Sequence, residues 1–162
     1  MSKYSIPRRS ISEAIYQKAN PSGDPFRIKK LKSRDDFKLF YTSIGLYLGE
    51  GDKRNKHNVK LVNSEPYIVR IFLRFLREIC GVNERKIRAS LNIFNDVDLQ
   101  RAVDFWVKSI GIKREQLTGV IVRESRGGTY KNKSKYGTLS IYVSNIKLKN
   151  ILISWCNDFI NI

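Results

Sequence analysis

The spacing of apolar residues changes several times along this chain, and the order of those changes constrains the fold more than any other feature. Apolar residues that recur every three or four positions are typical of one face of a helix, whereas short apolar or alternating runs are typical of strands. The segments follow one another as helix from 35, strand 59–62, helix 66–79, strand 85–94, helix 98–110, strands 117–123 and 138–143, and helix 146–159. This order predicts an α+β domain.

Turn signals between these segments predict how they are connected. The polar residues 52–58 lead from the first helix into the first strand, which predicts a hairpin. Residues 117–123 and 138–143 predict a second hairpin, joined by a long basic loop. Ser33 or Asp35 is available to cap the first helix.

A short internal similarity suggests that the domain is a degenerate duplication. Ser43-Ile44-Gly45-Leu46 resembles Ser109-Ile110-Gly111-Ile112, and a strand that leads into a helix follows each of them. The half-repeats would then cover 35–95 and 98–162, with the strand at 85–94 as an addition to the first. Chance similarity over four residues is the competing explanation.

The charge balance is the first feature that bears on function. The chain has 31 Lys and Arg against 15 Asp and Glu, for a net charge of +16. Cations placed on phosphates release counterions, so such a surface binds nucleic acid with a steep salt dependence. Charge that merely solubilises the protein is the alternative. An acidic membrane surface is a poorer partner, because no basic amphipathic anchor stands out.

Much of this charge lies before the first regular helix. Residues 1–34 contain nine Lys and Arg against two acids. We predict a basic N-terminal arm over 1–34 that crosses a groove or the nucleic-acid backbone, followed by one domain over 35–162. Within the arm, a short helix from about Ser10 to Lys18 should end at the Asn20–Pro25 turn. A flexible solvated tail is the alternative.

The cysteines and the apolar runs indicate the compartment. Cys80 and Cys156 lie among apolar helical neighbours, and His57 is the one histidine of the chain. A zinc site would require more Cys or His ligands, so both thiols are predicted to be reduced core residues. No run is long enough for a membrane span, and the N-terminus does not have the pattern of a signal peptide. A cytoplasmic, nucleoid-associated protein is therefore expected.

Residues 45–51, Gly-Leu-Tyr-Leu-Gly-Glu-Gly, place Glu50 between two glycines at the end of the first helix. Small residues let two helices pack closely, so that the acids of a pair project toward one ligand. Carboxylate oxygens suit Mg²⁺, which can polarise a phosphate and generate hydroxide. In the alternative interpretation, Gly49 and Gly51 only end the helix and Glu50 is an ordinary exposed acid.

Residues 43–51 resemble the LAGLIDADG motif of homing endonucleases, in the variant that ends Gly-Glu-Gly. The order of elements from Asp35 onward is also similar. More closely, the chain resembles bacterial LAGLIDADG-like proteins that share Gly-Leu-Tyr-x-Gly-Glu-Gly and a late strand such as Tyr136–Val143. The resemblance covers about residues 26–160. It implies helix-strand-strand-helix units and a saddle-shaped antiparallel sheet that reads the major groove of double-stranded DNA.

The resemblance also implies roles for particular residues. Glu50 would bind the metal, with Mg²⁺ as the cofactor, and Gly45 and Gly49 would be the packing positions of a helix pair. Ser64 would position water. A basic residue near the active centre is implied as well, with Lys131, Lys133 and Lys135 as the candidates. The candidates for contact with DNA are Lys60, Arg88, Ser90, Asn92, Arg123, Arg126, Lys131, Lys133, Lys135 and Tyr142.

Two further segments have alternative interpretations. The loop 123–136 is the most concentrated positive segment, and its cations would fix the position of the protein on phosphates without reading sequence. A solvated loop tip is the alternative. His57 is predicted to be a surface turn residue, and a general-base role is the alternative because Glu50 is near it in sequence.

Three functions are compatible with these features: a Mg²⁺-dependent DNA endonuclease, a DNA-binding regulator on the same fold that has lost cleavage, and an RNA-associated factor. Cleavage of both strands in this family requires two acids, and the chain has one clear acid, Glu50. A homodimer through the Glu50 helices would bring two acids together. If the third helix of the same chain lay there instead, Lys113 and Arg114 would oppose a metal site.

Overall fold

The computed structural model describes residues 8–125 and 134–161. Its elements, from the N-terminus, are α1 (Arg8–Ala19), α2 (Arg34–Glu50), β1 (Asn58–Asn63), α3 (Pro66–Arg74) with a π-helical continuation (Phe75–Ile79), β2 (Arg88–Phe94), α4 (Leu99–Ile110), β3 (Leu117–Arg123), β4 (Thr138–Ser144) and α5 (Ile146–Ile160). Short 3-10 turns cover Glu84–Lys86 and Arg114–Gln116. The predicted α+β class is confirmed, with helices and strands close to the expected positions.

The four strands form one mixed sheet in the order β1-β4-β2-β3. β4 is antiparallel to both of its neighbours, whereas β2 and β3 are parallel. The predicted hairpin of β3 with β4 is therefore wrong, and so is a fully antiparallel sheet. The reason is α4, which carries the chain from the end of β2 back to the start of β3, as parallel neighbours require.

The hairpin predicted after α2 is present in a reduced form. Gly51 makes an isolated antiparallel bridge with Leu61, and the amide of Asp52 donates to the carbonyl of Lys60 at 2.9 Å. The first arm of this hairpin is therefore a single bridge residue. The end of α2 is consequently fixed against the middle of β1.

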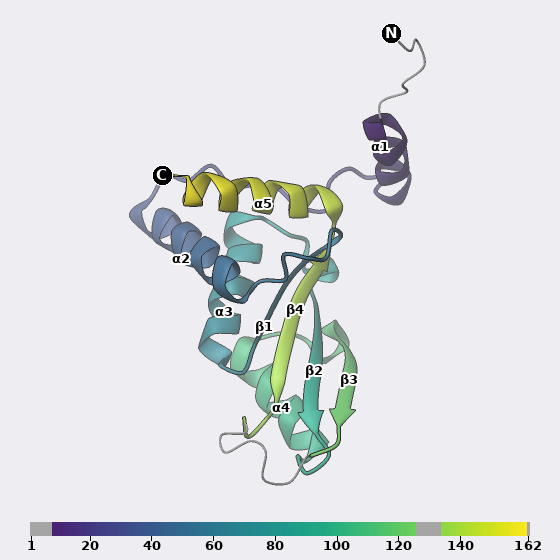
Figure 1. Cartoon of the computed structure of the whole chain (residues 1–162), viewed down its shortest axis with the longest axis vertical. Helices are drawn as coiled ribbons and strands as arrows, with labels where there is room; N and C mark the ends of the chain where they lie inside the picture. Colours follow the sequence, from purple (N-terminus) through teal and green to yellow (C-terminus); the bar gives the residue numbers. More distant parts are fainter. Residues whose placement is uncertain (1–7, 126–133, 162) are drawn as a thin grey trace.

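One face of the sheet is covered by helices. In Figure 1, α2, α3 and α5 lie on the same side of the strands, and α3 and α5 contact β1. Alternate residues of β1, β2 and β4 are buried on this side, as the predicted alternation requires. The largest fully buried side chains in the core beneath them include Trp106, Tyr47, Phe72 and Phe75.

The segment before α2 joins the body of the molecule. Phe26 is buried, and the amides of Arg27 and Lys29 donate to the carbonyls of Cys80 and Ile79, at 3.0 and 2.8 Å. The helix expected between Ser10 and Lys18 is confirmed by α1, and the turn after it contains Gly23 with a positive φ of 89°.

Polar contacts attach the N-terminal segment to α5. Asp24 forms an ion pair with Lys147 at 2.6 Å and accepts a hydrogen bond from the hydroxyl of Tyr16 at 2.9 Å. The side-chain Nδ2 of Asn145, the N-cap of α5, donates to the same hydroxyl at 2.9 Å. In Figure 1, α1 accordingly stands beside the start of α5, away from the sheet.

The first helix of the body begins at Ser33, one of the two predicted caps. Its hydroxyl accepts the amide of Asp36 at 3.1 Å, and Asp36 returns a contact to the Ser33 backbone. Lys29 also binds Asp36, at 2.7 Å. This ion pair and the amides around it lower the pKa of Asp36 to about 2.

The remaining compositional expectations concern thiols and membranes. Cys80 and Cys156 are both buried and free, as predicted for core residues. Within residues 8–125 and 134–161, none of the helices combines the length and apolar character that crossing a membrane requires.

Candidate functional site

The face of the sheet opposite the helices gathers the side chains that sequence analysis had selected for DNA contact. Lys60, Tyr142 and Arg88 are paired neighbours across β1, β4 and β2, so they form one row. Ser90 and Asn92 follow at alternate positions of β2, on the same face. The six predicted strand residues, Lys60, Arg88, Ser90, Asn92, Arg123 and Tyr142, therefore share one surface.

The row at the Lys60 end is supported by hydrogen bonds. The hydroxyl of Tyr142 is 2.9 Å from that of Thr118 on β3, and Thr118 also donates to the carbonyl of Ala89 at 3.1 Å. These contacts link β4 to β3 across β2. They hold the Tyr142 hydroxyl at the surface, where it can still accept or donate one more hydrogen bond.

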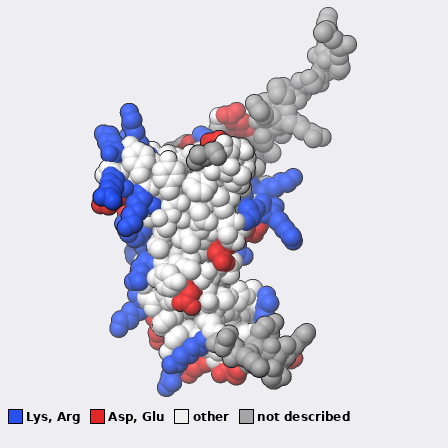
Figure 2. Space-filling model, turned by 60° about the vertical axis from the view of Figure 1, so that its left-hand side comes forward, with Lys and Arg blue, Asp and Glu red and all other residues white. Residues whose placement is uncertain are grey.

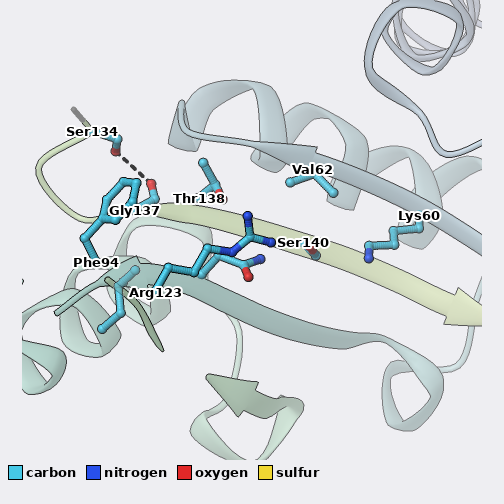
Figure 3. Close-up of a pocket in the computed structure, with 10 residues that line it drawn as sticks. Lys60, Val62, Phe94, Arg123, Ser134, Gly137, Thr138 and Ser140 are labelled. Atoms are coloured by element: carbon cyan, nitrogen blue, oxygen red, sulfur yellow. Dashed lines mark hydrogen bonds between the residues drawn. The ribbon is translucent and has the colours of Figure 1, made fainter. Parts of the chain in front are cut away.

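A shallow cavity of about 470 Å³ lies further along this face. In Figure 3, Arg123 extends toward Ser140 and Thr138, and Lys60 lies at the opposite end. Ser140 is 1% exposed, and neither its hydroxyl nor the side-chain oxygen of Asn92 has a hydrogen-bond partner among the described residues. Buried polar atoms without partners are costly, so these two oxygens lack a hydrogen bond that the described residues do not supply.

Sequence analysis missed Ser140 and Thr138. The available signal was strand alternation, because both residues lie at even spacing from Tyr142 on β4 and must point to the same side.

The loop that precedes β4 closes one end of the cavity. Gly137 has a positive φ of 74°, and a Cβ there would overlap the carbonyl of Asn92 and lie 2.7 Å from Ile93 Cγ2. Glycine is therefore required where the loop approaches β2. The indole of Trp106 donates to the carbonyl of Tyr136 at 2.8 Å, and the Tyr136 ring stacks on Phe105 at 4.1 Å between centroids.

Two of the predicted catalytic residues lie near this loop. Ser64 and Lys135 line a common depression of about 380 Å³ with Phe105 and Tyr136. Glu50 is not among the residues that line it. The predicted catalytic set is thus divided between two places, the Ser64–Lys135 depression and the end of α2. Three predicted loop residues, Arg126, Lys131 and Lys133, lie outside the described residues.

Glu50 is the last residue of α2 and is exposed. The Glu50 carboxylate makes no hydrogen bond or ion pair with another residue of the described part of the chain. Within the same ranges, no group of three or more His, Cys, Asp and Glu side chains is placed to bind a metal ion. One copy of the chain therefore offers one acidic ligand at this position. The helix C-terminus adds a partial negative charge there, which favours a cation.

The two glycines predicted to pack a helix pair have no close neighbour from another element within residues 8–125 and 134–161. A Cβ built on Gly45 or Gly49 would meet nothing within 4 Å, and both residues are exposed. Phe37 and Tyr41 are exposed on the same helix at four-residue spacing. α4, the helix expected at 98–110, contacts α3 and does not cover these glycines. It therefore does not pack against α2 as the second helix of the predicted pair.

Figure 2 displays the side of the molecule that carries α2 and α5. A broad surface without Lys or Arg, interrupted by acidic side chains, occupies its centre, with Lys and Arg along both margins. The exposed aromatic residues at the α2–α5 end of this surface include Phe37, Tyr41 and Phe159, and the Tyr41 and Phe159 rings are 6.1 Å apart. This side is therefore chemically distinct from the polar, cationic open face of the sheet.

A buried cluster joins the end of α2 to α5. Lys149 is 2% exposed, and its ammonium is 2.5 Å from the Tyr47 hydroxyl. It also donates to the carbonyl of Asp52, which accepts the Tyr47 hydroxyl at 2.8 Å. Sequence analysis missed Lys149, although its spacing from Leu152 and Cys156 places it on the buried face of α5.

His57 lies in the turn before β1 and is exposed, as predicted for a turn residue. Its amide donates to the side chain of Asn55 at 2.8 Å, and its carbonyl accepts the amide of Asn145 at 2.9 Å. These backbone contacts attach the turn to the start of α5.

Comparisons with protein-family models, with curated proteins and with solved structures gave no match to this chain.

Proposed function

We propose that this protein binds duplex DNA through the open face of its sheet and, as a pair of copies, hydrolyses phosphodiester bonds with Mg²⁺ at Glu50. The observation that carries the proposal is the common placement of Lys60, Arg88 and Arg123, with polar residues between them, on one uncovered face of a chain with a net charge of +16. The cations would bind phosphates, and the polar residues between them would meet base edges.

The dimensions of the face favour duplex DNA. Four strands about 4.8 Å apart span roughly 14 Å, and the major groove of B-DNA is about 12 Å wide. Lys60 is on the edge strand β1 and Arg123 is on the edge strand β3, so these two cations flank the face, where the phosphates that border a groove would lie. The centre contains Ser90, Asn92 and Ser140, which are uncharged and able to make hydrogen bonds.

Pairing through α2 would supply the second acid. An internal helix glycine costs about 1 kcal/mol relative to alanine, and no other element of the described part of the chain packs against Gly45 or Gly49. Close approach of a second α2 would give both glycines a packing role and bring two Glu50 carboxylates to one end of the helix pair. A homodimer is thus part of the proposal, in keeping with the resemblance to LAGLIDADG endonucleases.

The residues present fit Mg²⁺ only as such a pair. Glu50 is exposed, unpaired and at a helix C-terminus, and one carboxylate from each copy would leave positions for water and phosphate oxygens. When bound, Mg²⁺ would supply Lewis-acid polarisation of the phosphate and a lowered pKa of bound water. The chain itself would hold the duplex on the sheet and present the two carboxylates.

A second function is favoured by the same isolation of Glu50. With a single acid per chain, a copy that binds DNA without pairing would lack the proposed metal site. It would then act as a DNA-binding regulator. RNA binding is the third function, because the charge of the face attracts either nucleic acid.

Binding is tested with the full chain on a labelled DNA duplex and a structured RNA, at several salt concentrations. Arg123→Ala, Lys60→Ala and Arg88→Ala should each weaken duplex binding and reduce the slope of log affinity against log salt by about one. Lys108→Ala, on the exposed side of α4, removes the same charge elsewhere and should have little effect. Equal loss in all four variants, or preference for RNA, would contradict the proposal.

Cleavage is tested by incubating supercoiled plasmid with Mg²⁺ and either wild-type protein or Glu50→Gln. Glu115→Gln is the matched control, because it removes another exposed acid. Wild type and control should nick the plasmid, and Glu50→Gln should not. Retained salt-sensitive binding without wild-type nicking would leave the DNA-binding regulator as the function.

A further inference from the structure

The buried cluster of Lys149, Tyr47 and Asp52 lies directly behind the end of the motif helix. Lys149 comes from α5, Tyr47 from the last turns of α2, and Asp52 from the loop that leaves α2. The Tyr47 side chain is fully buried. Both Lys149 and Tyr47 donate to the one carbonyl oxygen of Asp52, so this carbonyl is held from two elements.

The partners of Lys149 are unusual for a buried lysine. The printed contacts are a phenol and a backbone carbonyl, and no carboxylate lies within ion-pair distance in the described residues. Burial lowers the pKa of Lys149, the Asp52 carboxylate opposes that shift, and burial raises the pKa of Tyr47. Burying an ammonium without a counter-ion is costly, so the position calls for a role that a smaller apolar residue would not fill.

The residue between Glu50 and Asp52 is also tightly held. A Cβ on Gly51 would overlap both the ring and the carbonyl of Tyr47. The Gly51 amide donates to the Tyr47 carbonyl at 2.9 Å, and Gly51 bridges to Leu61 on β1. The two residues that follow Glu50 are therefore fixed on Tyr47 and on the sheet, and Lys149 closes this arrangement from α5.

We infer that Lys149 is a positioning residue for Glu50. Its hydrogen bonds to the Asp52 carbonyl and the Tyr47 hydroxyl fix the direction in which the chain leaves α2, and this direction determines the position of the Glu50 carboxylate. The inference rests on the proposed function, because it concerns the acid of that site. Lys149 cannot itself contact a phosphate, since it is 2% exposed and its donors face inward.

The test compares Lys149→Met with Lys147→Met in the full chain. Methionine has a similar length without the charge, and Lys147 lies on the same helix with an exposed ion pair to Asp24. Hydrogen exchange at the backbone amides of Gly51 and Asp52 reports directly on how firmly these two residues are held, because both amides are hydrogen-bonded. Lys149→Met should accelerate exchange at these two amides by about tenfold or more, and Lys147→Met should leave both rates unchanged.

A metal readout then separates positioning from simple stability. Mn²⁺ replaces Mg²⁺, and paramagnetic broadening of the Glu50 and Gly51 amide signals gives the half-saturating metal concentration. Lys149→Met should raise this concentration several-fold in protein that remains folded, and Glu50→Gln should abolish the broadening. Nicking by Lys149→Met should fall about tenfold, with duplex affinity within twofold of wild type.

Tyr47→Phe is the second variant if Lys149→Met fails to fold. It keeps the ring beneath Gly51 and removes one donor to Asp52, so a smaller shift in the same direction is expected. Wild-type amide exchange and metal affinity in both variants would overturn the inference. Absence of Glu50-dependent metal binding in the wild type would overturn the proposed hydrolysis. Metal binding by the wild type that Lys149→Met leaves unchanged would overturn the positioning role alone, so the two failures are distinguishable.

Discussion

The two faces of α2 differ in residue type and in what surrounds them. One face contains Ile44 and Tyr47, both fully buried against the body of the protein. The other contains the exposed Tyr41, with Gly45 and Gly49, at which an added Cβ would meet none of the described residues of other elements. Both belong to one helix of 17 residues.

This difference separates the residues of α2 that the fold of a single chain explains from those that it does not explain. The buried face is explained by the fold of a single chain, because its side chains fill the core between α2, α3 and α5. The glycines of the open face are not explained in that way, since they weaken the helix and pack against nothing. In the proposed pairing, a second copy of α2 packs against them. Substitutions on the two faces should therefore have opposite effects on the stability of the single chain.

The largest effect should come from the buried face. Ile44→Ala removes a fully buried side chain and should lower the free energy of unfolding by about 3 kcal/mol. Urea unfolding measures this change. Thr42→Ala, at an exposed position of the same helix, is the control and should be nearly neutral. A small effect of Ile44→Ala would mean that this face is less well packed than described.

The next effect should come from Gly51, at the end of the buried face. Alanine there would overlap the Tyr47 ring and carbonyl, and relieving the overlap should cost about 2 kcal/mol. The comparison is with Gly49→Ala, two residues earlier and without such an overlap. Equal thermal stability of the two variants would argue against the close contact of Gly51 with Tyr47.

On the open face the sign should reverse. Gly45→Ala and Gly49→Ala should each stabilise the isolated chain by about 1 kcal/mol, because alanine favours the helix and meets no neighbour. The same variants should weaken self-association, measured by sedimentation over a range of concentrations. Destabilisation of the monomer would contradict the open position of Gly45 and Gly49, and unchanged self-association would contradict their role in pairing.

The smallest effect concerns Asp36, at the start of the buried face. Lys29 and neighbouring amides lower its pKa to about 2, so the charged form is favoured by folding. The resulting stability should be fully present above about pH 4, the ordinary pKa of the side chain, and lost as the pH falls through about 2. Thermal unfolding of wild type and Asp36→Asn should differ at pH 7 and converge near pH 2.

The sequence allowed prediction of those parts of the fold that depend on local periodicity and capping. The helices, Ser33 as one of two candidate caps, and the polar side of the strands that carry Lys60, Arg88 and Tyr142 follow from spacing. Strand order does not, because alternation says which side of a sheet a residue faces and nothing about which strand is next to it. The incorrect pairing of β3 with β4 has this cause.

The candidate site was predicted unevenly for similar reasons. Glu50 and the two glycines were found from a motif, but whether a helix covers them depends on tertiary packing. Lys149 was missed because charged residues are ordinarily solvated, and its place on the apolar face of α5 was a weak signal against that expectation. Ser64 and Lys135 came together across 71 positions of sequence, which no local pattern reports.

The central place of β4 has a consequence for how the molecule is made. β4 pairs with both β1 and β2, yet among the four described strands it is the last to be synthesised. Until residues 138–144 are synthesised, β1 and the β2–β3 pair each have an unpaired strand edge where β4 later pairs. The helices that cover the sheet then pack against two separate pieces rather than one continuous sheet. Until β4 inserts between these strands, the nascent chain is therefore partly ordered, with unpaired strand edges that can associate with other chains.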